Sequence, residues 1–173
     1  TGQKADYYSY FSKPNLSKTT PTYWMRASEV YFLRAEGALA GWDMGDTAEN
    51  LYTQGVELSF EENGIDKSKA AAYLTSGKTP ADAFWGQVTA VSDVTTQWTG
   101  TDEQKLEKII TQKWIALYPN GQEAWTEWRR TGYPKLHEVV NNKSGGVINT
   151  AQGVRRLPYP VSKLSTQDRA NID

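Results

Sequence analysis

The sequence contains no cysteine and only one histidine, His137. Without cysteine, disulfides, thiolate metal sites and thiol nucleophiles are all excluded. A single histidine is a poor basis for a histidine-rich metal site or for a Ser-His catalytic pair. We therefore expect neither a metal nor another cofactor.

The net charge is also close to zero, and long apolar runs are absent from the sequence. The chain has nineteen Lys and Arg residues and twenty Asp and Glu residues, which gives a formal net charge of −1. No overall positive field therefore attracts nucleic acid or an anionic membrane surface. No stretch approaches a membrane span, and the N-terminus lacks the charged-then-apolar layout of a signal peptide. Because it starts at Thr1 without a Met, we expect a mature or truncated piece.

Aromatic residues with a polar end are abundant instead. Seven Trp and ten Tyr stand beside only four Phe in 173 residues. Such side chains suit both protein cores and amphipathic ligand surfaces. The length fits one domain with its own core.

Two adjoining segments have helical periodicity. Over 23–42 apolar residues recur at intervals of three and four, with Arg26, Glu29 and Glu36 predicted on the opposite side. This face contains Trp24, Ala27, Tyr31, Ala35, Ala38 and Trp42, widened by Met25, Phe32 and Leu39. A second helix is predicted over 47–63, ending at Asn63 and Gly64, and its face contains Ala48, Leu51, Tyr52, Gly55, Val56 and Ser59. Small residues facing aromatics predict an antiparallel hairpin like those of tetratricopeptide repeat (TPR) proteins, although the strict 34-residue repeat is absent.

The rest of the chain alternates between helical and irregular sequence. A short helix is predicted over 66–74, then loop and short helical turns over 78–101 with Trp85 and Trp98. Thr101 and Gln104 form a capping-box pattern. The helix that they start should bury Leu106, Ile109, Ile110, Trp114 and Leu117. After a turn at 118–121, a helix over 122–130 should bury Ala124, Trp125 and Trp128 and end at Gly132.

The sequence therefore predicts a mainly α fold with an irregular, turn-rich C-terminal tail. Within a single domain, 1–173, the segments are a TPR-like hairpin at 22–64, an irregular region at 65–101, a helix pair at 102–132 and an extended tail at 133–173. Two prolines keep the end of Val154–Pro160 out of any helix.

Three segments resemble a known family. The run from Lys108 to Pro134, which reads KIITQKWIALYPNGQEAWTEWRRTGYP, closely resembles the C-terminal region of SusD/RagB-like outer-membrane nutrient-binding lipoproteins. Arg155–Pro160 resembles the late arginine-proline segment of that family. Arg26–Ala38 is similar to the family's R-x-x-E-x-x-x-x-x-A-E-A helix. Together these cover most of 22–160 in the family's order.

The resemblance implies a surface-exposed lipoprotein of Bacteroidetes-type outer membranes. Such a protein caps a TonB-dependent SusC-like transporter and holds glycan or peptide for import. Family members are much longer and carry a signal peptide and a lipidated Cys. The resemblance therefore implies that this chain is the C-terminal part of such a protein, attached to the membrane only through a lipidated N-terminus outside this sequence.

Candidate ligand residues lie in the irregular segment before the capping box. Sugar C–H groups stack on an exposed aromatic face while amides and carboxylates bind hydroxyls. Trp85 and Trp98 are the candidate platforms, and Asp93, Gln97 and Asp102 are the candidate hydroxyl partners. The alternative is that both tryptophans anchor the loop on the core. Trp114, Trp125 and Trp128 are expected in the core.

Catalysis is not expected. Glu123 and Glu127 stand one helical turn apart, which places two carboxylates on one face, and a glycosidase needs a pair of carboxylates. However, Arg129 and Arg130 follow directly, and ion pairing within the helix is the ordinary outcome. Arg155 and Arg156 are expected to tie the tail to helix carboxylates or carbonyls. Besides glycan binding, a TPR-like scaffold for a protein or peptide partner stays open as a second function.

Overall fold

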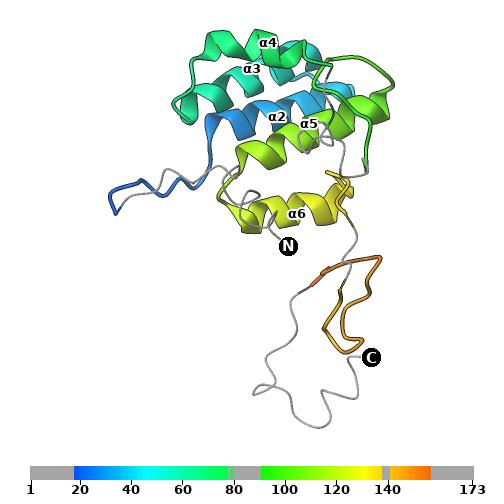
Figure 1. Ribbon diagram of the computed structural model, residues 1–173. Coiled ribbons are helices and arrows are strands. Elements are labelled where there is room, and N and C mark those ends of the chain that lie inside the picture. Colours follow the sequence, from blue (N-terminus) through cyan, green and yellow to red (C-terminus); the bar gives the residue numbers. More distant parts are fainter. Residues whose placement is uncertain (1–17, 78, 80–90, 138–140, 157–173) are drawn as a thin grey trace, which may run out of the picture.

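The computed structural model describes residues 18–77, 79, 91–137 and 141–156. Within these ranges the chain forms helices and irregular segments without a strand, which confirms the predicted mainly α fold. Figure 1 shows α3 and α4 together on one side, α2 and α5 in the middle, and α6 on the other side. No helix in the described ranges is long and apolar enough to cross a membrane.

Helices α2 (Ala27–Leu39) and α3 (Ala48–Glu62) form the predicted hairpin and share the most extensive contact between any two described elements. The Thr47 hydroxyl accepts the backbone N–H of Asn50 at 3.2 Å and caps α3. At the other end the chain leaves α3 through Asn63 and Gly64, whose φ of 70° is left-handed. The second helix of the hairpin therefore has the predicted bounds to within a residue.

The first helix differs from its prediction in length and in buried face. Trp24 and Trp42 lie outside α2, with 96% and 67% of their surfaces exposed. Glu29, predicted on the polar side, is only 4% exposed. The buried face of α2 consists of Ser28, Glu29, Phe32, Ala35 and Gly37. This face is buried because α2 packs against both α3 and α5, and Lys113 of α5 brings a positive charge to Glu29.

Phe32 lies at the centre of the hairpin contact. A Cβ atom placed on Gly55 of α3 would lie 2.8 Å from the Phe32 ring, so only glycine admits the ring this closely. Phe32 meets Tyr52 edge to face with 6.3 Å between ring centroids. Tyr52 is fully buried, and its hydroxyl donates to the carbonyl oxygen of Thr96 at 2.8 Å. This bond ties segment 91–101 to the hairpin.

A short helical segment follows the hairpin, as predicted over 66–74. The Asp66 carboxylate accepts the backbone N–H of Ser68 at 2.9 Å and starts the 3₁₀ helix η1 (Lys67–Lys69), which leads into α4 (Ala70–Leu74). Tyr73 of α4 packs on Phe60 of α3 with 5.5 Å between ring centroids. This contact holds α4 against α3.

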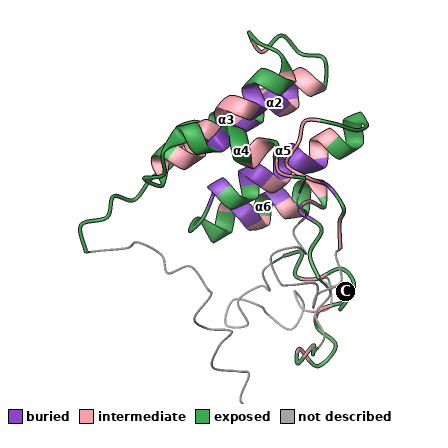
Figure 2. Cartoon of the chain, turned by 45° about the horizontal axis from the view of Figure 1, so that its top comes forward, coloured by how far each residue is buried: buried purple, intermediate pink, exposed green. Residues whose placement is uncertain are grey.

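Helix α5 (Asp102–Ala116) begins with the predicted capping box, in which Thr101 and Gln104 exchange side-chain and backbone hydrogen bonds. Its buried stripe was predicted only in part. Ile109, Ile110 and Leu117 are buried, but Trp114 is 37% exposed. Four polar side chains of α5 are buried instead: Glu107, Lys108, Gln112 and Lys113. Figure 2 shows buried residues along α5, which packs against α2, α3 and α6.

Helix α6 (Gly121–Thr131) is capped by the Asn120 side chain, which accepts the backbone N–H of Glu123 at 3.3 Å. It ends at Gly132, which has a φ of 78°. Both ends agree with the sequence prediction. Its buried residues are Ala124 and Glu127, whereas Trp125 and Trp128 are only partly buried. The expectation that these two tryptophans belong to the core was therefore wrong.

Candidate functional site

The described ligand residues predicted from the sequence are Trp98, Asp93, Gln97 and Asp102, and none of them lines the cavity described below. Trp85 lies outside the described residues. Asp93 is exposed, and the Gln97 amide donates to the carbonyl oxygen of Thr75 at 2.8 Å. Asp102 is the first residue of α5, exposed and 3.5 Å from the ammonium of Lys105.

Trp98 packs on the hairpin core rather than standing free. Its ring centroid lies 5.1 Å from that of Tyr52, and the ammonium of Lys105 lies 5.8 Å from the Trp98 centroid. The Lys108 ammonium donates to the carbonyl oxygens of Gln97 and Thr99 at 2.6 and 2.8 Å. Trp98 therefore helps to anchor this segment on the core.

A different set of residues encloses a cavity of about 450 Å³. It lies between α6, the residues directly after α6 and the segment around residue 153. Its walls are Trp125, Trp128, Gly132, Lys135, Leu136, His137, Thr150, Ala151, Gly153, Val154 and Arg155. We call this cavity the α6 pocket. Two tryptophans and three basic side chains dominate its chemistry, and none of the described residues lining it is acidic.

Helical spacing places both tryptophans in the wall of the α6 pocket. Trp125 and Trp128 lie three residues apart and so project from neighbouring positions on α6. The Trp125 indole N–H donates to the carbonyl oxygen of Val154 at 2.7 Å. This hydrogen bond joins α6 to a segment 29 residues further along the chain.

Arginine side chains flank both indole rings. The Arg129 guanidinium carbon lies 4.6 Å from the Trp125 ring centroid. That of Arg155 lies 4.4 Å from the Trp128 ring centroid. Both distances fit cation–π contacts. Arg155 therefore does tie the tail to a helix, as expected, but through an aromatic ring rather than a helix carboxylate.

Gly153 permits this close approach. Its φ is 64°, and a Cβ atom placed on it would lie 2.9 Å from the far edge of the Trp128 ring. Asn149 holds the turn before it, because its side-chain oxygen accepts the backbone N–H groups of Ala151 and Gln152 at 2.9 and 3.1 Å. The wall of the pocket contributed by 149–155 is therefore an ordered turn.

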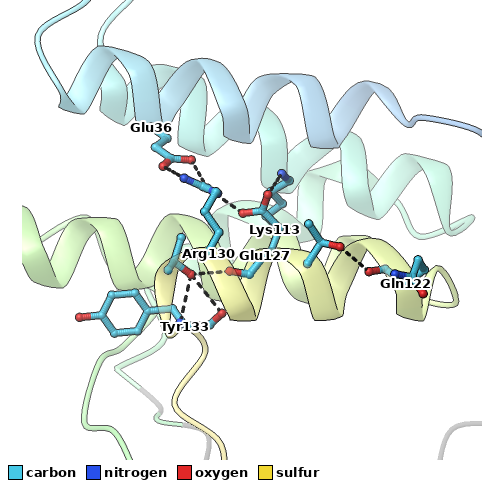
Figure 3. Close-up of polar contacts among 8 residues, drawn as sticks. Glu36, Lys113, Gln122, Glu127, Arg130 and Tyr133 are labelled. Carbon is cyan, nitrogen blue, oxygen red and sulfur yellow. Dashed lines mark hydrogen bonds and ion pairs between the residues drawn. The ribbon is translucent and has the colours of Figure 1, made fainter. Parts of the chain in front are cut away.

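On its other side, α6 is held by a chain of alternating charges (Figure 3). The Lys113 ammonium of α5 lies 2.9 Å from Glu127 of α6. Glu127 also accepts from Arg130 at 2.7 Å. Arg130 then donates two hydrogen bonds to Glu36 of α2, at 2.6 and 2.7 Å. We call these four residues the charge chain. It joins three helices.

Burial and ion pairing shift the pKa values of Glu127 and Glu29 in opposite directions. Burial by itself would raise the pKa of Glu127, but hydrogen bonds from Arg130 and Lys113 outweigh burial and hold the pKa below its ordinary value. Burial raises the pKa of Glu29, only partly opposed by the charge of Lys113. Glu127 is thus a firmly ionised carboxylate.

This geometry does not suit Glu123 and Glu127 for glycoside hydrolysis. A glycosidase needs a protonated carboxylic acid with a raised pKa beside a second carboxylate. Glu127 has a lowered pKa and its oxygens are taken by Lys113 and Arg130. The described residues also contain no cluster of three or more His, Cys, Asp and Glu side chains suited to a metal ion.

The family comparison covers the whole chain. Residues 1–173 match the SusD-like family model, described as Susd and RagB outer membrane lipoprotein. No curated protein matches the chain significantly.

Several solved structures are similar to this chain. A chitin-binding SusD homologue from Flavobacterium johnsoniae is 48% identical with a TM-score of 0.71, over 81% of this chain and 30% of that one. A SusD homologue from Bacteroides thetaiotaomicron is 49% identical with a TM-score of 0.74, over 84% of this chain and 32% of that one. A third SusD homologue, from Bacteroides uniformis, is 42% identical with a TM-score of 0.73, over 91% of this chain and 34% of that one.

This chain therefore spans about a third of the length of these relatives. The match along all 173 residues, together with the identities and the shared helical fold, shows its family. The chain belongs to the SusD-like family of outer-membrane lipoproteins.

Proposed function

We propose that the longer protein containing this chain binds glycan at the bacterial surface and delivers it to a TonB-dependent SusC-like transporter. The observation that carries this proposal is the 48% identity to a chitin-binding SusD homologue. Within that protein, the chain is the C-terminal part. Its helices supply a rigid scaffold, and its described surface includes a cavity with aromatic walls, the α6 pocket.

The second candidate is a scaffold for a protein or peptide partner, since TPR-like hairpins often bind chains on a concave face. One observation weighs against the hairpin interior as that surface: Phe32, Tyr52 and Gly55 close against each other there, with no room for a ligand. The predicted ligand set of Trp85, Trp98, Asp93, Gln97 and Asp102 stays a prediction, tested by the same titrations.

We expect the full-length protein to bind oligosaccharides and to co-purify with a SusC-like transporter from its native outer membrane. Titration of a panel of neutral and acidic oligosaccharides and of peptides, followed by tryptophan fluorescence, measures the first. Binding to peptides alone would favour the scaffold. Loss of affinity in Trp98→Ala with an unchanged fold would support the sequence-predicted site.

We also expect no hydrolysis of any glycan that binds. Glu127 is ion-paired, and Glu123 therefore lacks a partner acid. Release of reducing ends during prolonged incubation measures this. Release above buffer that Glu123→Gln abolishes would contradict the prediction, whereas release unchanged by Glu123→Gln would indicate a contaminating hydrolase.

A further inference from the structure

The α6 pocket combines two features that binding sites for charged sugars require. Its volume of about 450 Å³ lies within the range of roughly 300–1,000 Å³ typical of small-molecule sites. Trp125 and Trp128 supply apolar aromatic surface, while Lys135, His137 and Arg155 supply donors. We propose that the α6 pocket binds an acidic sugar, one that carries a carboxylate or sulfate group. This inference rests on the proposed function and names the class of glycan.

Arg155 is the main candidate to bind the acidic group. Its Nε donates to the carbonyl oxygen of Gln152 at 2.9 Å, and its guanidinium lies on the Trp128 ring. These two contacts fix the side chain. Its two terminal amino groups have no acceptor within the described part of the chain. A guanidinium held in this way presents paired N–H groups that match the oxygen spacing of a carboxylate or sulfate.

The other basic residues add to this preference. Lys135 lies 3.4 Å from Glu107, but its side chain is 49% exposed, so the pair leaves much of the ammonium open to a ligand. His137 is exposed and has no hydrogen-bond partner in the described ranges. None of the described residues that line the pocket carries a carboxylate, and the described carboxylate next to Lys135, that of Glu107, is already paired with Lys135.

The pocket is also largely organised before a ligand binds. The hydrogen bond from Trp125 to Val154 and the Asn149 turn fix the wall that carries Arg155. Gly153 lets this wall approach Trp128. A site that needs little ordering loses less affinity to conformational entropy. A neutral sugar would gain the aromatic surface but not the pairing with Arg155.

The test compares matched acidic and neutral ligands. The full-length protein is titrated calorimetrically with a galacturonic acid hexamer, a galactose hexamer, a chondroitin sulfate hexasaccharide and an octaglutamate peptide. We expect at least one acidic sugar to bind more tightly than the galactose hexamer. Arg155→Gln should weaken that acidic ligand about 10-fold or more, since a hydrogen bond between charged groups is lost. Affinity for neutral sugar should change less than about twofold.

Two further variants control the result. Lys143→Gln removes the same charge from an exposed position outside the pocket and should leave all affinities within about twofold. His137→Ala removes the ring N–H donor of a pocket residue without a described partner and should weaken binding of the acidic ligand, which keeps the test valid even if Arg155→Gln fails to fold. Melting curves of each variant check folding.

Three outcomes would overturn the inference. The galactose hexamer could bind as tightly as every acidic sugar, or the pocket variants could leave acidic sugar binding unchanged. In both cases the proposed function stands and only the class of sugar is wrong. Octaglutamate could instead bind with the same dependence on Arg155 while no sugar binds, which would overturn the proposed glycan function as well.

Discussion

Glu127→Ala is expected to lower the free energy of unfolding by about 3–5 kcal/mol, the loss typical when one partner of a buried ion pair is removed. The reason is Lys113, which is only 1% exposed and would lose its 2.9 Å contact with Glu127. Arg130 would lose one of its two carboxylate partners at the same time. Urea unfolding followed by tryptophan fluorescence measures the change.

Glu123→Ala is the matched control, because Glu123 lies on the same helix one turn earlier and has no ion pair within the described residues. It should lower the free energy of unfolding by less than about 1 kcal/mol. The double variant Lys113→Met/Glu127→Leu should recover most of the loss, because apolar residues of similar volume can replace a buried pair. A loss below 1 kcal/mol in Glu127→Ala would show that the charge chain does not hold α6.

The effect of Glu127→Ala should also depend on pH. The pKa of Glu127 is lowered in the folded protein, so its stabilising contribution is present above its ordinary, unfolded-state value. That contribution is lost as the pH falls through the folded-state value. The difference between wild type and variant should therefore be full at neutral pH and shrink in acid. The raised pKa of Glu29 has the opposite effect on the stability of the folded protein: its contribution favours folding in acid, where Glu29 is protonated, and falls as the pH rises.

Phe32→Ala is expected to lower the free energy of unfolding by a similar amount, about 3–5 kcal/mol, as for other buried phenylalanines. Phe32 is fully buried between Gly55 and Tyr52, so its removal leaves a cavity at the hairpin contact. Urea unfolding again measures the change. Leu33→Ala, a partly exposed residue on the same helix, should have a much smaller effect.

A double-mutant cycle with Gly55 tests the close contact itself. Gly55→Ala alone should destabilise by about 1–3 kcal/mol, because its Cβ would meet the Phe32 ring. In the Phe32→Ala background the same change should be neutral or stabilising, since the clash is gone and alanine favours helix. If the changes in unfolding free energy of the two single variants simply added in the double variant, Phe32 and Gly55 would not be in contact.

Local sequence signals predicted the ends of α3, α5 and α6 well, but not those of α2, which is shorter than predicted at both ends. Thr47, Asn63, Thr101 and Gly132 each mark an end whose chemistry depends only on nearby residues. The buried faces were harder, because the periodicity argument places charged residues toward solvent. Glu36 and Arg130 are 94 positions apart, and no local pattern indicates that they pair.

The α6 pocket was missed for a related reason. Trp125 and Trp128 have the spacing of core residues, and the sequence assigned them there. In the structure the buried residues of this helix are Ala124, which the sequence also placed in the core, and Glu127, which it did not. What turns the tryptophans into a pocket wall is the segment at 149–155, and its contact with α6 depends on tertiary structure.

The charge chain also fixes the rotation of α6 about its own axis. Ala124 is the single buried apolar residue of this helix, and so small a side chain would pack equally well over a range of rotations. Glu127 and Arg130 meet Lys113 and Glu36 at one rotation only. The same rotation directs Trp125 toward Val154 and Trp128 toward Gly153. Charges on one side of α6 thereby set the direction of the aromatic rings on the other.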